Sequence, residues 1–285
     1  MTRLVSLSRS LIGSGLVSLN GRSDGPSLVT DPDIETILAL SPSILIWPEK
    51  GAGWQTVTGG SLVTADAQNV GLLPDLSQLG GATLAEYLAF TGYTSAEFLD
   101  GTAPGRHLKA GTWASGADAD RPVLARSGKA LNMATGKKMG LRTAISVATN
   151  QTVIAAVRRP SNGTQTFTIA NAAGSRHAFW WWTDNLMYSS PGATEFNSGG
   201  TVASTGNNFV ITTKRNSGGV SVLSNGVERV GGGSSTASGS YDSTQFAGNA
   251  SGHELSFLAV FPSELSAGNT TTVQNIAKAT NGASF

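Results

Sequence analysis

A succession of short apolar segments, separated by turn-forming residues, is the feature that most constrains how this chain can fold. From about residue 121 onward these segments recur at the spacing typical of a β-sandwich. The chain contains 36 glycines among its 285 residues, and serine, threonine and asparagine crowd the gaps between the segments, as tight turns require. The expected strands lie near residues 151–158, 165–170, 176–183, 207–215, 219–224, 227–231 and 253–261. The pattern predicts an all-β fold, an antiparallel jelly-roll sandwich.

The dipeptide Asn225-Gly226 is the clearest local signal of a hairpin. Asn-Gly favours the two-residue type I′ turn, in which both central residues have positive φ. With that turn, alternation places Val220, Val222 and Val227 on one face of the hairpin. We expect these three valines to face the core.

Two short helices are predicted between residues 83 and 100, inside an otherwise strand-and-turn sequence. Thr83 with Glu86, and Thr94 with Glu97, have the spacing of a capping box before an apolar stretch. The helices would end at two glycines, Gly92 and Gly101. Segment 81–104 is therefore interpreted as an insertion that lies on the sandwich.

The chain divides into two parts. Residues 1–40 hold apolar residues in period-two runs, too few to bury a core of their own, and are predicted to be an extended N-terminal attachment arm. Residues 41–285 would form the main domain, opened by a proline-bounded strand within 41–48. A last helix over 269–279 has Val273, Ile276 and Ala277 at helical spacing, so it should pack against the sheet edge.

Composition argues against two classes of partner. The net charge is +1 and no Lys/Arg-rich run occurs, so the electrostatic attraction that drives nucleic-acid binding is missing. The apolar stretches fall well short of the roughly 20 residues that span a bilayer, so no membrane insertion is expected. The N-terminus lacks the apolar run of a signal peptide, and the chain has no cysteine. A virion component fits both facts.

The order of the expected elements over residues 120–280 resembles the concanavalin A-like, or laminin-G-like, jelly-roll superfamily. Segment 151–158 is similar to the first core strand of that superfamily, and 209–215 to its central strand. Segment 220–230 is similar to its Asn-Gly hairpin, and 252–261 to its closing strand before the terminal helix. The resemblance implies a lectin-like jelly roll.

Upstream, three segments resemble those that precede such jelly rolls in tailed-phage tail or fibre proteins: 62–77, 105–110 and 120–124. This resemblance implies a virion location, with other virion proteins, further copies of the chain and a host polysaccharide as partners. Where relatives have an aspartate-rich turn, residues 130–136 supply no carboxylate, so no calcium site is carried over. No cofactor is expected.

Acidic residues give no catalytic pattern. Polysaccharide-cleaving members of the superfamily carry a Glu-x-Asp-x-x-Glu run on one strand, and this chain has none. Glu195, Glu228 and Glu254 are isolated, and Asp118 and Asp120 lie in a Gly/Ala-rich loop where solvation is the simpler interpretation. We therefore expect no catalytic residues and a protein that is not an enzyme.

Histidines give no metal-binding pattern either. His107, His177 and His253 are far apart in the sequence, and no cysteine could join them. We expect no metal site.

Four consecutive aromatic residues stand out at 179–182. On a strand, Phe179 and Trp181 would face one way, and Trp180 and Trp182 the other. One pair can fill the core, while the other must lie on the far face with Tyr188 close behind. That face could be covered within the chain, form a subunit interface or stack on sugar rings. Trp180, Trp182 and Tyr188 are the candidate carbohydrate-binding or interface residues.

Three functions stay open at this point. The first is a phage fibre or spike component that binds a host-surface glycan, and the second is a capsid or tail decoration subunit without a ligand. The third is a polysaccharide-degrading enzyme, which the absent acidic run disfavours.

Overall fold

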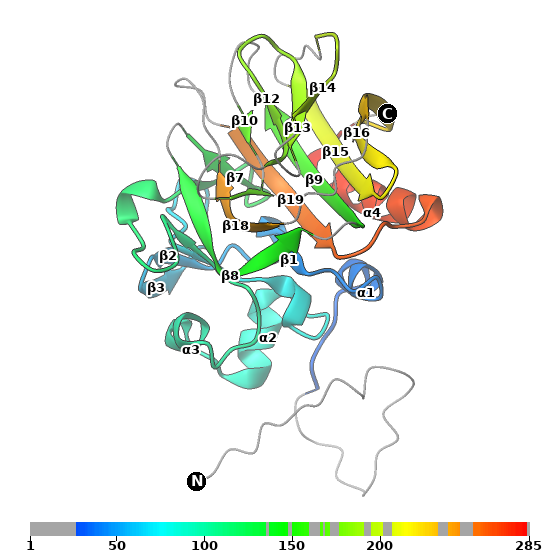
Figure 1. Cartoon of the computed structure of the whole chain (residues 1–285). Helices are drawn as coiled ribbons and strands as arrows, with labels where there is room; N and C mark the ends of the chain where they lie inside the picture. Colours follow the sequence, from blue (N-terminus) through cyan, green and yellow to red (C-terminus); the bar gives the residue numbers. More distant parts are fainter. Residues whose placement is uncertain are drawn as a thin grey trace, which may run out of the picture.

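The computed structural model describes residues 27–134, 137–147, 150–159, 166–167, 169–171, 177–190, 195–201, 207–232, 239–245 and 253–283. Within these ranges the chain forms two antiparallel β-sheets with a few helices outside them (Figure 1). The expected all-β sandwich is confirmed.

The first sheet, sheet A, has the strand order β17-β16-β15-β9-β19-β7-β6, and β1 also pairs with β19. Its strands are β1 (Ile44–Ile46), β6 (Val123–Ala125), β7 (Ala130–Met133), β9 (Gln151–Arg159), β15 (Asn207–Asn216), β16 (Gly219–Ser224), β17 (Val227–Gly232) and β19 (His253–Phe261). Strand β1 confirms the strand expected within 41–48.

The second sheet, sheet B, has the order β14-β13-β12-β11-β18-β8-β5-β4-β2-β3, and β10 also pairs with β12. Its strands are β2 (Trp54–Thr56), β3 (Gly59–Leu62), β4 (Leu72–Leu73), β5 (Leu108–Ala110), β8 (Lys138–Val147), β10 (Thr166–Phe167), β11 (Ile169–Ala170), β12 (His177–Trp181), β13 (Met187–Ser190), β14 (Phe196–Asn197) and β18 (Gly239–Gln245). Three short 3₁₀ helices lie outside the sheets: η1 (Pro48–Lys50), η2 (Leu76–Gln78) and η3 (Asp118–Asp120).

Strand β9 shows why the centre of sheet A reads as an unbroken apolar run. Val153, Ala155 and Val157 belong to the core between the two sheets. Ile154 and Ala156 point the other way, into a second core on the outer face of sheet A. A strand buried on both faces needs apolar residues at every position.

The second core is covered by the C-terminal helix α4 (Ala267–Asn281), which contacts β9, β15 and β19 (Figure 1). Val273 and Ala277 are fully buried there, and Ile276 is partly buried. The expected helix is therefore present, but the prediction that it packs against the sheet edge is wrong. It lies across the central strands because their outward apolar side chains offer more surface to bury than an edge does.

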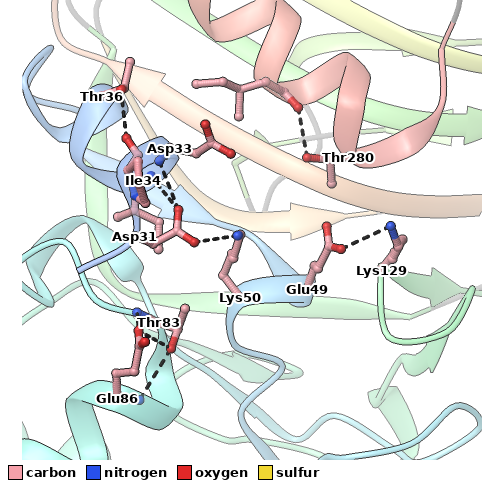
Figure 2. Close-up of polar contacts among 12 residues, drawn as sticks. Asp31, Asp33, Ile34, Thr36, Glu49, Lys50, Thr83, Glu86, Lys129 and Thr280 are labelled. Carbon is pink, nitrogen blue, oxygen red and sulfur yellow. Dashed lines mark hydrogen bonds and ion pairs between the residues drawn. The ribbon is translucent and has the colours of Figure 1, made fainter. Parts of the chain in front are cut away.

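The helical insertion is confirmed as α2 (Leu84–Thr91) and α3 (Ser95–Asp100). Thr83 and Glu86 form the first capping box, which Figure 2 shows, and the Glu97 carboxylate accepts from the Thr94 backbone N–H before the second helix. Both helices end at left-handed glycines, Gly92 and Gly101. Three buried side chains hold the insertion on the second core: Leu84, Tyr87 and Phe98.

Part of the predicted arm belongs to the folded body. Helix α1 (Pro32–Leu38) is capped by Asp31, whose carboxylate also binds Lys50 (Figure 2), and it buries Ile34 and Ile37 completely. The extended structure expected through residue 40 is therefore wrong from Pro32 onward, because two isoleucines three positions apart reach the second core only from a helix. Residues 1–26 of the arm lie outside the described residues, and attachment stays a prediction.

The predicted turn at Asn225-Gly226 is confirmed by positive φ at both residues, 50° and 76°. The Asn225 side chain adds to the turn, because its Oδ1 accepts from the backbone N–H of Val210 at 2.8 Å. The turn residue thereby extends the hydrogen-bond ladder of β15.

The prediction that the hairpin valines face the core is confirmed for Val220 and Val222, which are buried. It is wrong for Val227, which is 51% exposed. Without a bulge, the two-residue turn would pair Val222 with Arg229. A register shift after Val222 pairs it with Val230 instead. Because of the bulge, β17 contacts the core through Val230, while Val227 stays exposed beside the turn.

Candidate functional site

The run of four aromatics lies on strand β12 and just beyond it. Phe179 and Trp181 are fully buried in the core between the sheets, with perpendicular rings whose centres are 6.0 Å apart. Trp180 belongs to neither core cluster. The alternation predicted for these three residues is therefore confirmed.

Trp180 is covered by its cross-strand neighbour. It lies directly opposite Tyr188 of β13, and the two rings stack with centres 5.1 Å apart and an angle of 15°. Trp180 is only 5% exposed, whereas Tyr188 is partly exposed. Of the three alternatives for the far face, cover within the chain holds for Trp180, which is the buried support beneath Tyr188.

Trp182 is the exposed member of the run, with 42% of its surface accessible. It lies after the end of β12, at the start of the 182–186 loop that leads to β13. Its N–H donates to the Leu186 carbonyl at 3.2 Å, and Asn185 takes the left-handed φ of 63° that closes the loop. Trp182 therefore lies one residue beyond the strand that carries Trp180.

We call Trp180, Trp182 and Tyr188, with Asp184 between them in the loop, the aromatic ledge. Figure 1 shows β12 and β13 at the opposite end of the molecule from α2 and α3. The helical insertion does not cover the ledge.

Asp184 holds the ledge together by two hydrogen bonds. Its Oδ1 accepts from the Leu186 N–H at 2.8 Å, and its Oδ2 accepts from the Tyr188 hydroxyl at 2.6 Å. Burial raises the pKa of Tyr188 to about 12, with further contributions from Asp184 and from the charge of Glu195. The Tyr188 hydroxyl therefore keeps its proton at neutral pH, and Asp184 remains an exposed carboxylate at the rim.

Arg159 holds the 182–186 loop by hydrogen bonds from the buried side. It is the last residue of β9, and its fully buried guanidinium donates to Asn185 Oδ1 at 2.8 Å and to the Trp182 carbonyl at 3.4 Å. The same group lies 5.6 Å from the centre of the Trp181 ring. Burial lowers the pKa of Arg159 to about 10, against the opposing charge of Asp184, so the side chain stays cationic at pH 7.

Neither histidine whose side chain the structure describes belongs to the ledge. Burial, followed by the charge of Arg159, lowers the pKa of His253 to about 4. His107 is buried beside Asp75, whose backbone N–H donates to the His107 Nδ1 at 3.0 Å. The side chain of His177 lies outside the described residues. Within the described ranges, no three histidine or acidic side chains gather closely enough to hold a metal ion.

Other acidic residues are occupied in structural contacts. Glu254 binds Arg158 at 3.0 Å and Arg126 at 3.6 Å. Asp118 lies 3.4 Å from the Arg121 side chain and accepts from the Val57 N–H. These contacts tie strands and loops together.

A pocket of about 320 Å³ lies beside the turn between β15 and β16. The charged and amide groups in its wall already have partners: Lys214 donates to the Leu265 carbonyl at 3.0 Å, and Asn216 donates to Glu264 at 2.9 Å. We assign it no role. None of the helices in the described ranges has both the length and the apolar character of a membrane span.

Sequence reasoning found the aromatic residues of the ledge and missed its polar ones. Asp184 and Asn185 carry a turn signal, since both residue types accept local backbone hydrogen bonds and tolerate left-handed φ. Nothing in the sequence links Arg159 to this loop, because that contact joins two sheets.

No protein-family model matches the sequence, and no curated protein matches it either. The structure is similar to a Trypanosoma rangeli sialidase in complex with sialic acid, with a TM-score of 0.47 and 11% identity over 78% of this chain and 35% of that one. It is also similar to the ligand binding domain of botulinum neurotoxin serotype D in complex with N-acetylneuraminic acid. The TM-score is 0.45 and the identity is 13%, over 60% of this chain and 46% of that one. A Caenorhabditis elegans galectin matches with a TM-score of 0.31 and 12% identity over 42% of this chain and 92% of the galectin.

These matches correct the expectation that the chain is not an enzyme. Sialidases are enzymes, and several sialidase structures are among those similar to this chain. The exclusion of an enzyme is therefore withdrawn. At these identities and TM-scores the likeness assigns no activity to this chain. The chain spans 35% of the length of that sialidase.

Proposed function

We propose that this protein binds a glycan on the aromatic ledge. The observation that carries the proposal is the exposed ring of Trp182 in the same short loop as the exposed carboxylate of Asp184. A sugar ring has an apolar C–H face and a rim of hydroxyl groups. An aromatic ring can contact the first, while a carboxylate accepts hydrogen bonds from the second.

The ledge is also held rigid before any ligand arrives. Trp180 supports Tyr188 from beneath, Tyr188 fixes Asp184, and Arg159 holds the loop through Asn185. A site that is already ordered loses little conformational entropy on binding. This favours recognition by a shallow surface.

The test is binding of the purified protein to an array of immobilised oligosaccharides, with Trp182→Ala as the variant. We expect saturable binding to at least one oligosaccharide and a loss of about tenfold or more in Trp182→Ala, the order of a lost stacking contact of ~1.4 kcal/mol. Phe90→Ala is the matched control, because Phe90 is an aromatic of similar exposure, 45%, on helix α2 at the other end of the molecule.

Trp180 is left intact in this test because it is buried, and its truncation would remove the support of the ledge. Wild-type protein that binds no oligosaccharide would contradict the proposal. So would a Trp182→Ala variant that binds as tightly as the wild type. If Trp182→Ala instead dissociates an oligomer of the protein in light scattering, the ledge is a subunit contact.

The virion location is a further part of the proposal, and it rests on the sequence resemblance of residues 62–77, 105–110 and 120–124 to phage tail and fibre proteins. Display of many copies on a particle would raise the avidity of a weak, shallow glycan site. Mass spectrometry of purified particles from a host that encodes this chain tests it. Absence of the chain from such particles would overturn the location without affecting glycan binding.

A further inference from the structure

The charges around the aromatic ledge are unevenly presented to solvent. Asp184 and Glu195 are both exposed, and the charges of both act on the Tyr188 hydroxyl. Among the described residues of β12, β13, β14 and the loop between β12 and β13, no lysine or arginine occurs. A ligand that approaches Tyr188 therefore meets two carboxylates.

Arg159 is a described cation that contacts the loop beneath this group, and it faces inward. Its side chain is completely buried, and its guanidinium is directed at Asn185 and the Trp182 carbonyl beneath the loop. It offsets part of the charge of Asp184, but a ligand on the outer surface cannot form a direct ion pair with it.

Strand β17, which contacts β13 and β14, adds no net charge. Its two charged residues, Glu228 and Arg229, are adjacent, exposed and opposite in sign. The described surface around the ledge thus keeps the negative character that Asp184 and Glu195 give it.

We propose that the aromatic ledge selects neutral sugars and rejects sugars that carry a carboxylate, such as sialic acids. The inference rests on the proposed function. An ionised carboxylate has about four acceptor positions, and Asp184 uses two of them for the Leu186 N–H and the Tyr188 O–H. The hydroxyl groups of a neutral sugar can donate to the remaining positions, whereas a ligand carboxylate has no proton to donate and is repelled.

The experiment measures affinities for neutral oligosaccharides and for the same oligosaccharides capped with sialic acid. We expect about tenfold tighter binding of the neutral member of each pair at low ionic strength, and a smaller ratio at high salt, because exposed charges are screened. Glu195→Gln should reduce the ratio. Glu35→Gln is the control with the same change of charge, on the exposed side of α1, and should leave the ratio unchanged.

The outcomes separate the two proposals. Equal or tighter binding of the sialylated members would overturn the selection of neutral sugars while glycan binding stands. An equal fall of the ratio in Glu195→Gln and Glu35→Gln would also overturn it, because the effect would then come from net charge rather than from the ledge. Binding to neither member of any pair would overturn the proposed function itself.

Discussion

At the scale of single residues, two buried histidines should make the stability of this fold depend on pH. Burial lowers the pKa of both His107 and His253 to about 4, and the charge of Arg159 contributes at His253. In the unfolded chain a histidine titrates near ~6.5. Because the folded pKa is the lower one, each neutral histidine stabilises the fold fully above about pH 6.5, and this contribution is lost as the pH falls toward about 4.

We expect the free energy of unfolding to fall by about 2 kcal/mol per histidine between pH 7 and pH 5. His107→Gln should be less stable than the wild type at pH 7 but should lose about 2 kcal/mol less on acidification, since glutamine does not titrate. Burial raises the pKa of the neighbouring Asp75, which acts in the opposite direction in both proteins. Urea unfolding at the two pH values measures the difference, and identical pH dependence would contradict the role of His107.

The ledge shows how far residue-level prediction reaches. Strand alternation correctly separated Phe179 and Trp181 from Trp180, because that separation follows from backbone geometry alone. It could not show that Tyr188 covers Trp180, since that contact depends on the register between β12 and β13. The contribution of Arg159 depends on how two sheets pack, which no local pattern encodes.

At the scale of elements, the hairpin between β16 and β17 depends on the positive φ of Gly226, 76°. Gly226→Ala should cost about 1 kcal/mol, because a Cβ atom disfavours this region. Gly268→Ala is the matched control: Gly268 lies in the first turn of α4, in open space, and the change should be neutral or stabilising by about 0.5 kcal/mol. Thermal unfolding of both variants measures the effect, and equal midpoints would remove the strained turn as the explanation.

Elements with a local signal were predicted well, and elements formed by distant pairing were not. The boundaries of α2 and α3 follow from capping residues that lie within one turn of them. Strands β8 and β18 escaped prediction because each carries many polar residues without strict alternation. They are strands because they pair with each other across about a hundred residues of sequence.

At the scale of the whole molecule, the second core includes part of the predicted arm. Helix α1 contributes the fully buried Ile34 and Ile37 to it. Removal of residues 1–40 should therefore destabilise the fold by about 4 kcal/mol or more, as large apolar truncations do. Removal of residues 1–26 leaves every described core residue in the chain, and we expect it to change the unfolding midpoint by no more than a few degrees, the scale of a change of about 1 kcal/mol. Similar midpoints for the two truncations would contradict the place of α1 in the core.

The most direct test of a glycan site on the ledge is the NMR signal of the indole N–H groups in protein labelled at its 6 tryptophans. Trp182→Phe identifies the signal of Trp182, and the buried Trp47, Trp54 and Trp181 serve as internal references. During titration with a neutral oligosaccharide, we predict that the Trp182 signal shifts saturably while those of the three references stay in place. An unchanged Trp182 signal at saturating ligand would contradict the ledge as the glycan-binding site.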